Sequence, residues 1–354
     1  MEGTRRIRSK RRGLFGLALW MTAVIALTNC GRDKPTLNIY TWADYFKPAL
    51  IQRFEKEFNC RVVIDTFDSN EAMYAKLKAG ATGYGLLTPT SYMVSLMNSQ
   101  DMLQPLDHRL LPNLVHIDPD YLKAAIDKTM DHSVPYMIVN TGLAYLKSKV
   151  KDFVPSWSMF DRQDLKGRMT MLNDMRETIG AGLKFLGYSV NSTSENELRQ
   201  AKGIVLRWKK NIAKYENEQY KTGVASGEFL LVQSYSGDIL QVQKENPDVM
   251  FAIPVEGTSI SVDDLVIPKA AKEVSLAHAF INFLHDPQIA AENVIFLNYL
   301  TPNKDCYSLL PPLLRNNPAL FMNPEIRAKS EILADLGPAT ALYMKIWDEI
   351  KSGK

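Results

Sequence analysis

Residues 39–46, with the sequence IYTWADYF, set one carboxylate among aromatic rings directly after a short apolar run. Trp42 and Tyr45 offer π-faces, and Asp44 offers a negative charge. An organic cation is attracted by a carboxylate and aromatic faces together. A structural interpretation is also open, in which the two rings pack in a core or loop and Asp44 caps a helix. The motif therefore predicts either a cation site or a packed strand end.

The chain contains none of the motifs that mark common catalytic or nucleotide-binding sites. The patterns G-x-S-x-G, G-x-x-x-x-G-K, G-x-G-x-x-G and C-x-x-C do not occur. The histidines are scattered without metal-ligand spacing, and basic residues after the N-terminal segment do not cluster with aromatic residues. We therefore expect a binding protein with no catalytic residue, no metal, no cofactor and no nucleic-acid partner. The histidines are His108, His116, His132, His278 and His285.

Alternating strand and helix patterns surround the aromatic motif. Repeated βα units predict an α/β fold with an open parallel sheet, in which ligands bind beyond the carboxyl ends of the strands. Trp42–Tyr45 and Pro89–Tyr92 fall at that edge. The predicted elements of this region are strands at 37–42, 61–67 and 85–88 and helices at 47–58, 70–79 and 92–99.

A second region, about residues 156–254, repeats this mixture, and a further strand and helices follow it. We find no short-period repeat and no low-complexity segment. The tail, residues 325–351, has a helical pattern. The other predicted elements are strands at 168–174, 229–235 and 263–268 and helices at 177–187, 195–210 and 274–285.

The first 29 residues have the pattern of a secretory signal peptide. Six basic residues precede the apolar run Leu14–Leu27, which is shorter than the roughly 20 residues of a membrane span. The run ends in LTNC and resembles the lipobox of bacterial lipoproteins, in which the cysteine, here Cys30, is acylated. Asn29 departs from the small residue usual before that cysteine. The alternative is a plain signal segment with an incidental cysteine.

The chain beyond residue 29 has a different charge from the whole. Residues 1–29 carry six basic residues and one acidic residue, so of a total charge of +3 the remainder carries −2. The basic charge therefore belongs to targeting, and a slightly acidic protein suits a cationic ligand. Cys60 and Cys306 remain, and either form a disulfide in an oxidising compartment or are buried thiols.

Five segments, in order and at matching spacing, resemble the spermidine/putrescine-binding proteins of bacterial ABC importers. The resemblance covers residues 37–354 and implies a two-lobed type II periplasmic-binding-protein fold with a hinge between the lobes. It implies an N-terminal lobe of residues 37–140 and 262–307, a C-terminal lobe of residues 141–261 and 308–354, and a lipidated tether at 30–36. The segments are IYTWADYFKPALIQRFEKEF, DSNEAMYAKLKAG, PTSYMV, NDMRETIGAGLKFLGYSVN and YLTPN.

Family ligand positions carry over to this sequence one at a time. Asp263 falls on the main ammonium-binding carboxylate, Tyr235 on an aromatic platform, and Asp238 on an acid found in putrescine-specific members. Asp174 has the alternative of capping a helix, and Glu177 that of a surface ion pair. The full set of predicted ligand-binding residues is Trp42, Asp44, Tyr45, Thr90, Tyr92, Asp174, Glu177, Tyr235, Asp238, Asp263 and Tyr299.

Three positions depart from the family pattern. Ser261 stands where members carry an aromatic ring, Gly85 replaces a common acid, and Leu333 stands where spermidine-preferring members carry glutamine. A third ligand amine would find no acceptor at Leu333. The family resemblance, together with leucine in place of glutamine at position 333, predicts a receptor that favours putrescine over spermidine.

The sequence thus predicts a lipid-anchored receptor on the periplasmic or outer face of the cytoplasmic membrane. It would capture putrescine or spermidine and deliver it to an ABC transporter permease, without catalysis. Two alternatives stay open: a receptor of the same fold for another small solute, and a periplasmic enzyme or ligand-sensing module. The missing motifs argue against the enzyme.

Overall fold

The computed structural model describes residues 1–3 and 34–353, of which Thr36 onward forms one compact unit. Most of the predicted signal peptide, and the predicted lipidation site Cys30, lie outside the described residues. In the described part of the chain, no helix is both long and apolar enough to span a bilayer.

Parallel βα units open the fold, as the sequence predicts. Strand β1 (Thr36–Thr41) pairs in parallel with β2 (Arg61–Thr66) and with β3 (Leu86–Leu87). The connecting helices are α2 (Pro48–Glu57), with Pro48 in its first turn, and α3 (Asn70–Lys78), which Ser69 caps by accepting a hydrogen bond from the Ala72 amide. The loop after each strand therefore lies at the same edge of the sheet.

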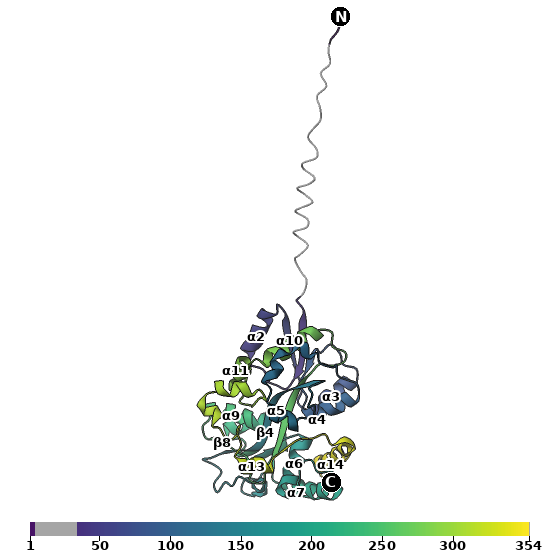
Figure 1. Ribbon diagram of the computed structural model, residues 1–354. Coiled ribbons are helices and arrows are strands. Elements are labelled where there is room, and N and C mark those ends of the chain that lie inside the picture. The colour runs from purple at the N-terminus through teal and green to yellow at the C-terminus, as the bar shows by residue number, and fades with distance from the viewer. Residues whose placement is uncertain (4–33, 354) are drawn as a thin grey trace. The chain divides into compact units, whose positions relative to one another are not determined.

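The sheet then becomes antiparallel, a change that the prediction of an open parallel sheet did not include. Strand β9 (Ser259–Val266) pairs antiparallel with β3 and with β4 (Ser133–Leu146). Strand β4 pairs with β9 up to Asn140, with β7 (Leu231–Tyr235) from Thr141 and with β8 (Val249–Ala252) from Leu143. Figure 1 shows β4 between two ends of this unit. One end carries α2 and α10 (Val274–Leu284), and the other carries α6 (Met175–Phe185), α7 (Glu195–Lys209) and α14 (Thr340–Ser352). The ladder has an irregularity between Pro135 and Met137, where the period-two pattern is interrupted.

The second half of the unit has its own parallel strands, with β5 (Met169–Met171) between β6 (Lys214–Tyr215) and β7. Helix α7 shows why these helices form. Ser194 caps it, and Leu198, Val205 and Trp208 recur at helical spacing on its buried face. This face packs against α6 and α14.

The remaining strand is β10 (Glu331–Ile332). The remaining α-helices are α4 (Ser91–Ser99), α5 (Pro119–Ala124), α8 (Gln219–Ser226), α9 (Ser236–Glu245), α11 (Pro287–Leu297), α12 (Pro312–Arg315) and α13 (Pro324–Lys329). Short 3₁₀ helices are η1 (His108–Leu110), η2 (Pro112–His116), η3 (Trp157–Asp161), η4 (Lys304–Leu309) and η5 (Gly337–Ala339).

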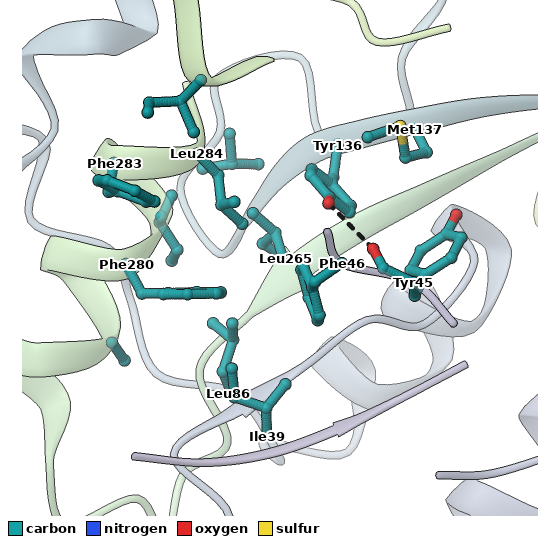
Figure 2. Packing of buried hydrophobic residues seen from close by; sticks show 14 of the residues in the cluster. Ile39, Tyr45, Phe46, Leu86, Tyr136, Met137, Leu265, Phe280, Phe283 and Leu284 are labelled. Carbon is teal, nitrogen blue, oxygen red and sulfur yellow. Dashed lines mark hydrogen bonds between the residues drawn. The ribbon is translucent and has the colours of Figure 1, made fainter. Parts of the chain in front are cut away.

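A buried apolar cluster beneath β1, β4 and α10 fixes the loop that carries the aromatic motif. Phe46 packs against Tyr136 and Phe280, and the Tyr136 hydroxyl donates a 3.2 Å hydrogen bond to the Tyr45 carbonyl (Figure 2). Cys60 belongs to this cluster, whereas Cys306 is buried in another, beside α11.

The predicted helix over residues 325–351 is wrong in its middle. Helix α13 ends at Lys329, β10 pairs with β9, and α14 begins only at Thr340. The Gly337–Pro338 pair explains part of the break, because proline cannot continue a helix from the preceding turn. As a result Leu333, whose amide bonds to the Ile260 carbonyl, lies beside the central strands.

Candidate functional site

A cavity of about 780 Å³, including its opening to solvent, lies where the loops after β1, β3, β5 and β6 meet β9 and the start of α9. It is lined by ten of the eleven predicted ligand residues, all except Glu177. The predicted ones are Trp42, Asp44, Tyr45, Thr90, Tyr92, Asp174, Tyr235, Asp238, Asp263 and Tyr299. The others are Ala43, Asp68, Val139, Asn217, Glu218, Lys221, Gln241, Ser261 and Leu333.

Asp263 lies deep in this cavity with its carboxylate held by two hydroxyl groups. Tyr45 Oη donates to Oδ2 at 2.5 Å, and Thr90 Oγ1 donates to Oδ1 at 2.7 Å. Thr90 precedes α4 and its side chain makes no capping bond, so its hydroxyl is available for Asp263. Burial raises the pKa of Asp263 to about 6 in spite of these bonds. Each oxygen keeps acceptor capacity for a further donor.

Asp174 lines the cavity and also caps a helix. Its Oδ1 accepts hydrogen bonds from the Arg176 and Glu177 amides, which satisfies the start of α6. Its Oδ2 faces the Tyr235 hydroxyl at 3.5 Å. Burial raises the pKa of Asp174. The two interpretations of this residue from the sequence therefore coexist in one side chain.

Glu177 lies behind the cavity wall rather than on it. Ser261 Oγ donates to Oε1 at 2.6 Å, and Thr141 Oγ1 donates to Oε2 at 2.9 Å. Ser259 also donates to Oε2. Burial, followed by the nearby Asp174 charge, raises the pKa of Glu177 to about 7. The alternative of a surface ion pair does not describe this residue, since it is 1% exposed and Lys184 pairs with Glu331.

Tyrosine rings form one wall of the cavity. The ring centroids of Tyr45 and Tyr299 are 6.3 Å apart, and Tyr299 also belongs to the cluster of Figure 2. A Cβ at Gly237 would lie 2.5 Å from the Tyr299 ring, so only glycine at the start of α9 leaves room for it. The Tyr299 hydroxyl donates a 2.9 Å hydrogen bond to Asp238, which also accepts one from Tyr220. The wall therefore presents rings with a second carboxylate behind them.

The cavity mouth carries charged residues outside the predicted ligand set. Lys221 Nζ is 3.9 Å from Asp44 Oδ2 and 3.9 Å from Glu218 Oε2. Asp44 has a positive φ of 53°, and Lys47 rather than Asp44 occupies the N-cap of α2, so the capping interpretation of Asp44 does not hold. Only their place at the junction between β6 and α8 could have distinguished Glu218 and Lys221 from other charged pairs.

Two polar atoms of the lining are buried and have no hydrogen-bond partner among the described residues: Trp42 Nε1 and Asn217 Oδ1. The Asn217 amide nitrogen is occupied, since it donates to the Asp68 carbonyl at 3.0 Å. A buried polar atom without a partner is costly, and in a cavity it marks a place for a ligand or water. The site therefore has both a free donor and a free acceptor.

The charge of the lining suits the binding of a cation. Six carboxylates line the cavity, against the single basic side chain of Lys221 among the described lining residues. None of the lining residues is a cysteine or a histidine, and among described residues no three metal-binding side chains gather. The carboxylates are Asp44, Asp68, Asp174, Glu218, Asp238 and Asp263.

Comparison with known proteins gives consistent matches. Residues 49–322 match the family model of bacterial extracellular solute-binding proteins. The chain is 32% identical over 340 residues to the spermidine/putrescine-binding periplasmic protein of Escherichia coli, covering 96% of each chain. It is 31% identical over 365 residues to the putrescine-binding periplasmic protein SpuD of Pseudomonas aeruginosa, covering 98% of this chain and all of that one.

A solved structure agrees with the fold. The TpPotD lipoprotein of Treponema pallidum superposes with a TM-score of 0.80 at 32% identity, covering 89% of this chain and 99% of that one. The likeness confirms the predicted two-lobed type II periplasmic-binding-protein fold. The chain therefore belongs to the bacterial extracellular solute-binding proteins, a family of binding proteins and not of enzymes, together with the spermidine/putrescine-binding proteins.

Proposed function

We propose that this protein is an extracytoplasmic receptor that binds a polyamine in the cavity and delivers it to an ABC transporter permease. The observation that carries the proposal is the lining itself, in which six carboxylates and tyrosine and tryptophan rings face one space. A polyamine is an alkyl chain with ammonium groups, so its charges suit the carboxylates and its methylenes suit the rings. The relatives named for spermidine and putrescine support the same choice.

The energetics of such a site are sufficient for tight binding. Each cation–π contact contributes about 0.5–2 kcal/mol. Each hydrogen bond to a charged group contributes about 1.5–3 kcal/mol. At the upper end of these ranges, a few contacts of each kind can supply the roughly 8 kcal/mol of micromolar affinity in addition to the costs of ordering.

The preferred polyamine in this proposal is putrescine. One ammonium group binds at Asp263 and the neighbouring Asp174, and the other binds at Asp238 beside Tyr299. A third amine needs another acceptor, and Leu333 is a buried apolar residue of the lining. Ser261 leaves room where a ring would stand, but its hydroxyl is engaged by Glu177. Burial of an amine without a hydrogen-bond partner costs more free energy than burial of the additional methylenes of spermidine contributes.

Closure of two lobes around the ligand is the proposed mechanism. We infer lobes of residues 37–140 with 262–307, and 141–261 with 308–354. Support comes from β4, which changes its partner from β9 to β7 between Asn140 and Thr141. Both lobes contribute carboxylates, Asp263 from the first and Asp174 from the second. The ligand then favours the closed state, because only that state offers both sets of contacts.

A lipid anchor at Cys30 completes the proposal. The apolar run that ends in LTNC supports it, and so does the lipoprotein of Treponema pallidum with the same fold. The acylated protein would stay on the periplasmic or outer face of the cytoplasmic membrane, next to its permease.

A native mass spectrum of the protein as purified tests the proposal without assuming a ligand. We expect an adduct with the mass of a diamine, and its loss after denaturation and refolding. An adduct of another mass that binds again on addition of that solute would favour the alternative receptor of the same fold.

A further inference from the structure

Lys221 contributes a positive charge to a cavity that otherwise gathers negative charge. It lies on α8, and its side chain is 25% exposed. Its Nζ lies 3.9 Å from a carboxylate oxygen of Asp44, in the loop after β1, and 3.9 Å from one of Glu218, which precedes α8. Among the described residues of the lining, no other side chain is basic.

The acids around Lys221 form a third anionic site, separate from the two that the proposed function uses. Asp44 and Glu218 each place a carboxylate oxygen 3.9 Å from the Lys221 ammonium, which opposes the rise that burial causes in the pKa of Glu218. Asp263 and Asp174 lie deeper, and Asp238 is bonded by Tyr299 and Tyr220. The protein thus supplies its own cation to the site nearest the mouth.

We propose that Lys221 is a specificity-determining residue whose ammonium group occupies the third cation position and so selects diamines against triamines. The inference rests on the proposed function. A diamine fills the two inner sites and leaves the Lys221 contacts intact. The third ammonium of spermidine would have to approach the same carboxylates as Lys221, where two like charges repel.

The proposed effect of Lys221 on spermidine binding differs from that of Leu333. Leu333 withholds an acceptor, whereas Lys221 competes for acceptors that exist. Competition of this kind acts on a charged group and depends on the acids as well as on the lysine. Removal of the lysine charge should therefore help a triamine only while Asp44 is present.

The test compares dissociation constants of putrescine and spermidine for four variants by calorimetry. K221M keeps the aliphatic stem and removes the charge, so spermidine should bind about tenfold more tightly while putrescine changes by less than about threefold. K221R keeps a cation and should keep the wild-type ratio. In D44N/K221M, the increase in spermidine affinity over wild type should be smaller than in K221M.

K202M is the matched control. The Lys202 side chain is similarly exposed, at 22%, and its ammonium lies 2.6 Å from the Glu349 carboxylate. Neither residue lines the cavity, so this variant should bind both ligands as wild type does. If K221M changes both affinities by the same factor, Lys221 only stabilises the contact between α8 and the loop after β1, and the inference is wrong. No gain for spermidine would also overturn it. If wild-type protein binds neither polyamine, the proposed function fails instead.

Discussion

At the scale of single residues, the buried carboxylates differ in what they can still accept. Asp263 receives two hydroxyl hydrogen bonds and faces the cavity. Glu177 receives three and lies behind Ser261. The first is therefore suited to bind an ammonium group directly, and the second to hold the wall and add negative potential.

Replacement of Asp263 by asparagine should abolish most putrescine binding. The ammonium would lose its desolvated partner, at a cost on the order of 2–4 kcal/mol. Calorimetry gives the affinity, and circular dichroism checks that the variant folds. E177Q is the comparison, and it should weaken binding less because its side chain does not line the cavity. Wild-type affinity in D263N would mean that the ligand is anchored elsewhere.

Binding should weaken in acid. Burial raises the pKa of Asp263 to about 6, so below that pH the free protein carries a proton that the ligand must displace. The folded state then holds more protons than the unfolded state between about pH 4 and 6, and the stability of the unliganded protein falls as pH rises through this window. Titrations and thermal melts at about pH 5 and pH 8 measure both effects. Equal affinity at the two pH values would contradict this account.

At the scale of elements, the site depends on strand ends and on one short tail strand. The pairing of β10 with β9 brings Leu333 to the lining. L333Q should offer an amide acceptor there and narrow the gap between putrescine and spermidine affinities. A competition titration measures the gap, and a gap as wide as in wild type would show that position 333 does not select the ligand.

The elements also show what the sequence could and could not predict. The early strands and helices were predictable because their apolar spacing is regular, and the family positions lie at the cavity for ten of the eleven residues. Strand β4 was missed because Pro135 and the adjoining irregularity interrupt its alternation. Asp68, Glu218 and Lys221 were missed because a charged residue in a loop or on a partly exposed helix face carries no local signal of the partner across the cavity.

At the scale of the whole molecule, the proposed lipid anchor and the proposed ligand site lie in different parts of the chain. Cys30 precedes the compact unit that begins at Thr36. C30S should therefore release the protein from membranes and leave putrescine affinity in the soluble protein unchanged. Fractionation of cells gives the first result and calorimetry the second. Partition of C30S with membranes as in the parent would show that this cysteine is not the anchor.

Whether the cavity binds a polyamine can be decided by calorimetric titration of putrescine into ligand-stripped, full-length protein. We expect saturable heat with one diamine per chain, and we expect putrescine to displace spermidine at equal concentration. If folded protein releases no heat with either polyamine, the cavity is not a polyamine site.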